Sequence, residues 1–449
     1  NGPVKLQSLS GSIVVNPGTS LTNGVTANGT GDILLQAVSG NVTANAGITS
    51  SIGNITLDAS GTLNSSGPIQ TGGSGTVYLS SGSNIAFSSM STGGGNLQIL
   101  SGGDLTLGSI NAGTGRVYLQ ASGDIKDSDS NTNSTNVIAS ALAMKATGKI
   151  GDSDTNAPVN TNRNAIGTQV ATLAAQSASG IYVQEADGVT IDSVTVSTDR
   201  VNFNSTRTSQ SQSLEDLSTT NNGPVKLQSL SGSIVVNPGT AGTNGITANG
   251  SGDILLQTVS SGTIVTNAVV QSDFGHITLL SKDALNIVDL LRTGAPGTIY
   301  LSSDSDVEIN TLNTNTNLQI ISGSNLTLGS INSGTGRVYL QASGDIKDSD
   351  SNTNSTNIIA SAVAMKAGGK IGDSDTNAPV DTNRNAIGTQ VTTLAAQSAN
   401  GIYVQEADGV TIDSVAVSTD RVNFNSTRTG QAQSLEDLST TNNGPVKLQ

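Results

Sequence analysis

The sequence predicts an all-β fold, a parallel β-solenoid in which the chain coils into stacked turns of about 20–30 residues. Short segments alternate between apolar and polar residues, as β-strands do. These segments recur at regular spacing. The 449 residues include 53 glycines, no cysteine and no tryptophan, and aromatic residues make up 2%. A thin core of stacked aliphatic side chains does not need large rings, and regularly spaced apolar residues argue against disorder.

The basic unit is the segment from Gly115 to Ile125, which returns unchanged from Gly336 to Ile346. Val117 and Leu119 face inward on a short strand, a Ser-Gly corner follows, and Ile125 begins a second strand. Looser copies open at Gly31, Gly53, Gly75 and Gly95. Most copies carry a third apolar position, so we expect three strands in each turn, around a roughly triangular section. The first inward residues form a predicted column of Ile33, Ile55, Val77, Leu97 and Val117.

A long repeat contains these short turns. The hexapeptide beginning at Gly2 recurs at Gly223 and again at Gly444, and the two steps are equal in length. We therefore divide the chain into residues 1–222, residues 223–443, and residues 444–449 as the start of a third repeat, and expect more copies in a longer protein. Strand openings near Leu142, Leu173 and Val201 complete about nine turns per long repeat, which would rise roughly 43 Å at about 4.8 Å per turn.

Residues 205–222 are very polar, with Leu214 and Leu217 as their apolar anchors. They form either a wide turn of the solenoid or a flexible joint between repeats. The continuous solenoid is favoured because the two leucines lead directly into the next predicted strand.

The charge excludes some partners. A net charge of −14 disfavours binding to nucleic acid or to an anionic membrane surface. No apolar run is long enough for membrane insertion. The absence of cysteine excludes a disulfide framework.

Paired Asp-Ser-Asp loops are the candidate metal site. Asp127 and Asp129 precede Asp152 and Asp154 by one predicted turn, and the second repeat has Asp348, Asp350, Asp373 and Asp375. If the two turns are in register, the four carboxylates stack about 5 Å apart. Like charges this close repel one another, so a bound cation would stabilise them, and carboxylate oxygens favour calcium. The alternative is that they are solvated turn residues that point apart. No cofactor is required in either case.

Two further features have a functional and a structural interpretation. A possible carboxylate pair for glycan cleavage occurs in Glu185 to Gly188 and is repeated in Glu406 to Gly409. The same residues are also typical of an ordinary turn between strands. The single histidine, His276, stands where the first repeat has Asn54. We therefore expect no enzyme. Four tyrosines occupy outward strand positions: Tyr78, Tyr118, Tyr300 and Tyr339. They would form part of a flat face for lateral packing or for stacking on sugars. The alternative is that they are ordinary exposed strand residues.

The run Gly-Asn-Ile-Thr-Leu-Asp-Ala-Ser-Gly at 53–61 resembles the repeats of filamentous-haemagglutinin-like secreted proteins. Lys149-Ile150-Gly151, followed by Ala165 to Thr168 and Gly180 to Val183, looks like the long-turn pattern of giant repetitive, adhesin-type bacterial surface proteins. The resemblance implies a right-handed β-helix, secretion, and a role as stalk, adhesin or matrix fibre. No functional residue transfers from it.

The function that we expect is structural: a repeat segment of a very long bacterial extracellular protein that forms a rod-like fibre or stalk. Its partners would be further copies, end to end or laterally. One alternative is an adhesin that binds glycan or a cell-surface partner through a lateral face. The other is a polysaccharide lyase or hydrolase.

Overall fold

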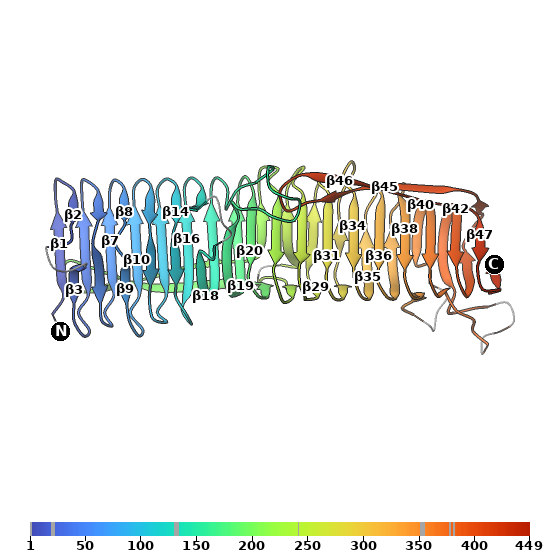
Figure 1. Cartoon of the computed structure of the whole chain (residues 1–449), viewed down its shortest axis with the longest axis horizontal. Helices are drawn as coiled ribbons and strands as arrows, with labels where there is room; N and C mark the ends of the chain where they lie inside the picture. The colour runs from blue at the N-terminus through green and yellow to red at the C-terminus, as the bar shows by residue number, and fades with distance from the viewer. Residues whose placement is uncertain are drawn as a thin grey trace. The chain divides into compact units, whose positions relative to one another are not determined.

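The computed structural model describes residues 2–18, 23–129, 134–240, 242–350, 355–376, 379 and 382–449. These residues form β-strands joined by short turns and loops, and they include no helix long and apolar enough to cross a membrane. The chain divides into two compact units, Asn1–Gly223 and Pro224–Gln449. Within each unit the strands of the stacked turns pair in parallel from one turn to the next, which confirms the predicted all-β parallel solenoid (Figure 1).

The first unit stacks its strands in three columns. The first column contains β1 (Val4–Ser8), β4 (Ile33–Ala37), β7 (Ile55–Ala59), β10 (Val77–Ser81), β13 (Leu97–Ser101) and β16 (Arg116–Ala121). The second contains β2 (Ile13–Val15), β5 (Val42–Ala44), β8 (Leu63–Ser65), β11 (Ile85–Phe87), β14 (Leu105–Leu107) and β17 (Ile125–Asp127). The third contains β3 (Asn23–Ala27), β6 (Gly47–Ser50), β9 (Ile69–Thr71), β12 (Ser89–Ser91) and β15 (Ser109–Asn111).

Longer strands close the first unit. Both β18 (Val137–Ala146) and β19 (Ile166–Ser177) run through the third and the first columns. Three shorter strands pair with β19: β20 (Ile181–Glu185), β21 (Val189–Ile191) and β24 (Leu217–Thr219).

The second unit repeats this plan. Its first column contains β25 (Val225–Ser229), β28 (Ile254–Thr258), β31 (Ile277–Ser281), β34 (Ile299–Ser303), β36 (Leu318–Ser322) and β38 (Arg337–Ala342). The second contains β26 (Ile234–Val236), β29 (Ile264–Thr266), β32 (Leu285–Ile287), β39 (Ile346–Asp348), β41 (Lys370–Ile371) and β43 (Gly401–Glu406). The third contains β27 (Asn244–Ala248), β30 (Val269–Ser272) and β33 (Leu291–Arg292).

Several strands of the second unit span two columns. Both β35 (Val307–Asn313) and β37 (Leu326–Asn332) join the second and third columns, and β40 (Ile358–Ala367) and β42 (Ile387–Ser398) join the third and first. The short β44 (Thr411–Ile412) and β47 (Leu438–Thr440) pair with β42, and β48 (Val446–Leu448) pairs with β43.

The core is the predicted stack of aliphatic side chains. In the first column Ile33 pairs with Ile55, Ile55 with Val77, Val77 with Leu97, and Leu97 with Val117, and all five are 0% exposed. Each side chain therefore buries its equivalent one turn away, and stability is close to a sum of contacts between neighbouring turns.

The glycines that open the strands are required by this stacking. A Cβ on Gly95 would lie 1.9 Å from the carbonyl oxygen of Gly75, and one on Gly115 would lie 2.2 Å from that of Gly95. Backbone of one turn therefore passes directly over backbone of the previous turn, and only glycine leaves room for this.

Residues 194–214 depart from the prediction. They were expected to contain a solenoid strand near Val201, but they leave the solenoid as an antiparallel hairpin in which Val201 ends the first strand. The segment 205–222 is thus neither a wide turn nor a joint throughout: Leu214 belongs to the hairpin, and Leu217 returns to the solenoid in β24. The hairpin is stabilised on the outside of the solenoid because its apolar residues pack against outward side chains of the first column.

The repeat is not a whole number of turns. In the second unit β25 begins the first column, whereas β48, which carries the same Val-Lys-Leu sequence one long repeat later, pairs with β43 in the second column. The repeat therefore spans about eight and a third turns in place of the predicted nine. At about 4.8 Å per turn this corresponds to a rise of about 40 Å.

Candidate functional site

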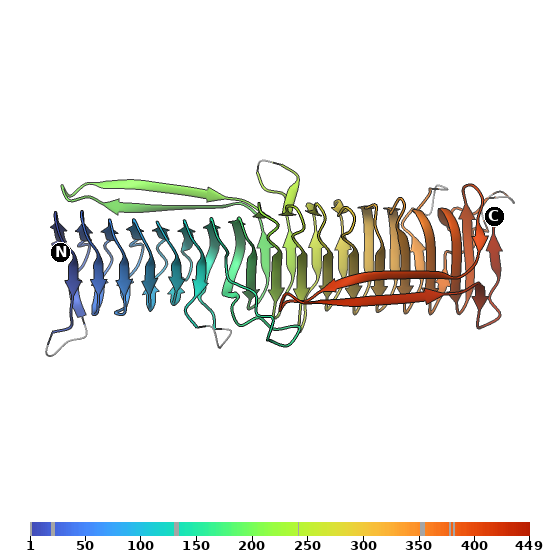
Figure 2. The same cartoon turned by 90° about the horizontal axis from the view of Figure 1, so that it is seen from above.

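Each unit carries one hairpin on the outside of its solenoid. The first hairpin consists of β22 (Val194–Val201) and β23 (Arg207–Leu214), and the second of β45 (Val415–Val422) and β46 (Arg428–Leu435). Both are two-stranded antiparallel sheets with eight residue pairs in unbroken register. Figure 2 shows that each hairpin runs across the solenoid strands of its own unit.

The apolar side of the hairpin covers the outward side chains of the first column. Val194 and Val196 of β22 pack with Tyr118, Ala143 and Ala174 in one buried cluster. The second unit builds the same cluster from Val415, Val417, Tyr339, Ala364 and Ala395. Outward residues of a solenoid are normally solvated, so these small apolar side chains are explained only by the hairpin above them.

The predicted tyrosine face is therefore wrong as an exposed surface. Tyr78, Tyr118, Tyr300 and Tyr339 are only 6%, 2%, 7% and 2% exposed. Burial raises the pKa of the Tyr78, Tyr118 and Tyr339 phenols. These rings are part of the packing between hairpin and solenoid, and none of them offers a free face for sugar stacking.

Polar contacts fix the register of the first hairpin. The backbone N–H of Val201 donates to Oγ1 of Thr56 at 2.8 Å, and Oγ1 of Thr198 donates to Oε1 of Gln98 at 2.9 Å. The second hairpin repeats both contacts at the equivalent residues of its own unit, from Val422 to Thr278 and from Thr419 to Gln319. The polar outward residues are thus matched to the hairpin one by one.

An arginine near each hairpin tip binds an aspartate of the solenoid through two hydrogen bonds, and we call this pair the clasp. Nε and Nη2 of Arg207 donate to the two carboxylate oxygens of Asp32 at 3.0 and 2.9 Å. Arg428 holds Asp253 in the same way, at 2.9 Å for both bonds. The aspartates are only 12% exposed, so removal of the arginine would leave a largely buried carboxylate without its charge partner.

A lysine of the solenoid also contacts the hairpin tip in each unit. Lys226 is 1% exposed, and its Nζ donates to the carbonyl oxygen of Asn423 at 2.8 Å. Burial lowers the pKa of Lys226 to about 7; the nearby Asp253 opposes this shift and Arg428 adds to it. In the first unit Lys5 donates to Asn202 at the same distance, 2.8 Å.

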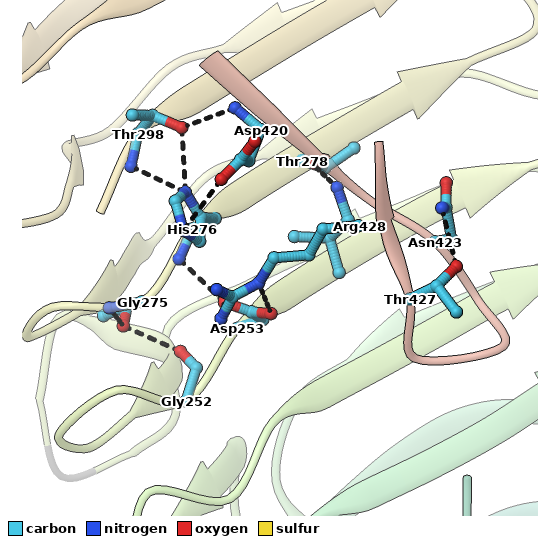
Figure 3. A network of polar contacts seen from close by, with 12 residues as sticks. Gly252, Asp253, Gly275, His276, Thr278, Thr298, Asp420, Asn423, Thr427 and Arg428 are labelled. Atoms are coloured by element: carbon cyan, nitrogen blue, oxygen red, sulfur yellow. Dashed lines mark hydrogen bonds and ion pairs between the residues drawn. The ribbon is translucent and has the colours of Figure 1, made fainter. Parts of the chain in front are cut away.

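His276 makes the clasp of the second unit different from that of the first (Figure 3). The backbone N–H of Thr298 donates to its Nδ1 at 3.1 Å, and Oγ1 of Thr298 lies 2.8 Å from the same atom. A backbone N–H can only donate, so Nδ1 accepts and the ring proton is on Nε2, which lies 3.5 Å from the Asp420 carboxylate. Burial lowers the pKa of His276. In the first unit Oδ1 of Asn54 accepts the equivalent bonds from Thr76, at 2.8 and 3.0 Å.

The aspartates of the predicted calcium site are engaged by other groups. Asp152 accepts from Lys149 at 2.8 Å, and Asp154 from Arg163 at 2.6 Å. In the second unit Asp373 accepts from Lys370 at 2.9 Å and Asp375 from Arg384 at 2.7 Å. The described residues contain no group of three or more acidic, histidine or cysteine side chains suited to hold a metal ion. The calcium site stays a prediction.

Asp127 and Asp348 are the last residues of β17 and β39 and are half-buried. Oδ1 of Asp127 accepts from the backbone N–H of Asp129 at 3.0 Å and from Nδ2 of Asn136 at 2.7 Å. Oδ2 is buried and has no hydrogen-bond partner among the described residues. Burial raises the pKa of this carboxyl. Asp348 repeats the arrangement, with Asp350 and Asn357 as donors at 3.0 and 2.7 Å.

Glu185, the candidate catalytic carboxylate, is tied into the solenoid. Oγ1 of Thr168 donates to its Oε2 at 2.6 Å, and the backbone N–H of Val170 donates to Oε1 at 3.0 Å. The side chain is 0% exposed, and burial raises its pKa to about 7. Glu406 accepts the equivalent bonds from Thr389 and Val391 at 2.7 and 3.0 Å. In both units the carboxylate joins neighbouring strands.

The hairpins are the feature that sequence reasoning missed. Two signals point to them: apolar and polar residues alternate in 194–201 but not in the polar segment 207–214, and the outward positions 143 and 174 are alanines. Comparison with protein-family models, with curated proteins and with solved structures finds no match for this chain.

Proposed function

We propose that the chain is a structural repeat segment of a very long bacterial extracellular protein, and that it contributes to a rod-like fibre or stalk. One observation carries the proposal: the second copy of the long repeat builds the same solenoid and the same hairpin contacts as the first. The Arg207–Asp32 and Arg428–Asp253 pairs are an example. A chain of this kind gains length by adding copies.

The hairpin suits a load-bearing role. The β22 strand contacts β7, β10, β13, β16, β18 and β19, and so spans six neighbouring first-column strands. A plain solenoid joins each turn only to the turns beside it. A strand that crosses many turns ties them together, so that one turn cannot separate without also breaking hairpin contacts.

The extracellular assignment is supported by composition and by the resemblance described above. The chain has no cysteine, carries a net charge of −14, and has repeats in the style of secreted bacterial surface proteins. We propose a non-enzymatic role that needs no cofactor. The adhesin alternative loses its aromatic surface, because the hairpins cover the tyrosines on which that surface depended.

The test compares recombinant proteins with two, three and four copies of the long repeat, each copy having the sequence 223–443. Negative-stain electron microscopy should show particles of constant width whose length grows by about 40 Å per added copy. A length that does not increase with copy number would remove the proposal. Antibodies against the repeat should also label intact bacteria that express the parent protein, and labelling only after cell lysis would contradict the extracellular assignment.

A further inference from the structure

His276 gives the second hairpin a contact that depends on the protonation of one ring. The backbone N–H of Asp420, in β45, donates to Oγ1 of Thr298 at 2.9 Å, and this hydroxyl lies 2.8 Å from Nδ1 of His276 (Figure 3). The backbone N–H of Thr298 donates to the same ring nitrogen at 3.1 Å. The solenoid residue that binds the hairpin backbone therefore uses the neutral ring as its hydrogen-bond acceptor.

A protonated ring cannot serve as this acceptor. Both nitrogens of an imidazolium carry a proton, so the ring offers donors only, in whichever way it is turned. Protonation of His276 thus leaves the backbone N–H of Thr298 facing another donor. Thr298 is half-buried beneath the hairpin, and a donor that loses its acceptor in such a place is costly. The docked hairpin therefore favours the neutral ring.

The charges around the ring do not reverse this preference. The Asp420 carboxylate lies 3.5 Å from Nε2, but its side chain is 43% exposed, and an ion pair with so exposed a partner contributes little. The Asp253 carboxylate is already bound by Arg428 through two hydrogen bonds, and the buried Lys226 contacts the same hairpin tip. Burial is the main cause of the lowered pKa of His276, and Arg428 adds to it. Asp253 and Asp420 oppose the shift.

The hairpin covers the ring without sealing it. The His276 side chain is only 9% exposed. A cavity of about 260 Å³ nevertheless lies beside it, lined by Pro296 and Thr298 of the solenoid and by Ser418, Asp420, Gly430 and Gln431 of the hairpin. Protons can reach the ring through this cavity. The hairpin residues on its far side are the ones that can move when the ring becomes charged.

The first unit contains the same contact without a titratable ring. Oδ1 of Asn54 accepts both bonds from Thr76, and Oγ1 of Thr76 accepts from the backbone N–H of Asp199 at 3.1 Å. The clasp between Arg207 and Asp32 matches that of the second unit. At this contact the two units differ by one side chain, and an amide does not titrate. The first hairpin is therefore a control for the second within the same molecule.

We propose that His276 makes the second hairpin sensitive to acid: protonation of the ring opens the half of the hairpin nearest its turn, residues 419–431, while the first hairpin stays docked. The cluster of Val415 and Val417 with Tyr339 holds the other half, because none of its members depends on the ring. The inference goes beyond the proposed function, since a stalk needs no response to acid. Its test does not depend on whether copies of the repeat form a fibre.

Hydrogen exchange of the full chain, read by mass spectrometry, tests the proposal. Rates are compared at pH 7.5 and pH 5, on either side of the usual histidine pKa of about 6.5, and corrected for the intrinsic effect of pH. An opened hairpin exchanges freely, because two strands alone are marginally stable. Exchange in 419–431 should become about tenfold faster at pH 5, as the loss of one buried hydrogen bond predicts. The equivalent residues 198–210 and the solenoid strand β36 should change little.

Two reciprocal substitutions separate the ring from other titrating groups. His276→Asn should remove most of the acceleration in 419–431; Lys226 is kept in this variant, so a response caused by the lysine would persist. Asn54→His should give 198–210 an acceleration that the wild type lacks. Circular dichroism checks that each variant folds, and the comparison of the two hairpins in the wild type needs no variant. Equal acid responses of the two wild-type hairpins, a full response in His276→Asn, or no gain in folded Asn54→His would overturn the proposal.

Discussion

Replacement of Gly95 by alanine tests the stacking of the turns at a single atom. The new Cβ would lie 1.9 Å from the carbonyl oxygen of Gly75 and 2.7 Å from its carbonyl carbon. Both are backbone atoms of the neighbouring turn, so neither can rotate away. The two turns must separate locally, which we expect to lower the free energy of unfolding by about 3 kcal/mol. In a unit of this size the melting temperature should fall by about 6–12 °C.

Two other glycines serve as controls. Gly113 has a φ of +54° and no atom within 4 Å of an added Cβ, so alanine there should cost about 1 kcal/mol through backbone strain alone. Gly409 has neither a positive φ nor a neighbour within 4 Å, and alanine there should leave stability unchanged. Calorimetry ranks the three variants. If Gly95→Ala melts like Gly409→Ala, the turns do not stack in this register.

Three further predictions concern buried groups and calcium. The pKa of Lys226 is lowered to about 7 in the folded protein, so between pH 7 and 10.5 the unfolded chain binds more protons than the folded one. The free energy of unfolding should therefore rise with pH across this window, by roughly 4–5 kcal/mol. Denaturant titrations at several pH values should show this rise, and Lys226→Met should flatten it. Because burial lowers the pKa of His276, the free energy of unfolding should decrease as the pH falls from 6.5 through the pKa of the folded protein. His276→Asn should remove this pH dependence. Equal slopes of unfolding free energy against pH in the variant and the wild type would contradict the buried environment of the ring. The calcium hypothesis predicts that calcium raises the melting temperature of protein freed of metal by a chelator, and that Asp127→Asn with Asp348→Asn abolishes the increase; no response to calcium would remove the hypothesis.

The solenoid was predictable because its signal is local and repeated. An inward aliphatic pair, a glycine and a Ser-Gly corner recur at nearly constant spacing, so residues such as Ile33 and Ile55 are in register by counting alone. The predicted repeat length follows from the same counting. The hairpin was not predictable in this way, because β22 alternates with the same period as a solenoid strand, and periodicity does not reveal which way a strand turns.

The candidate site depends on contacts that no local pattern encodes. Arg207 and Asp32 are 175 residues apart, and Val201 and Thr56 are 145 apart. The sequence shows that His276 replaces Asn54, but not that both side chains accept bonds from the threonine one turn further on. The outward tyrosines were expected at a solvent-facing position, and only the hairpin above them explains their burial.

Disulfide trapping between turns is the most direct test of the central claim, that residues one turn apart lie on top of one another. The chain has no cysteine of its own, so Ala86→Cys with Thr106→Cys can be oxidised without background. These residues are paired across adjacent turns, and Lys126 pairs with Thr106 one turn further on. Adjacent positions are about 4.8 Å apart and those two turns apart about 9.6 Å, whereas a disulfide needs Cα atoms within about 6.8 Å. We expect a disulfide between cysteines at 86 and 106 and none between cysteines at 86 and 126. Equal trapping of both pairs, or of neither, would contradict the stacking of adjacent turns.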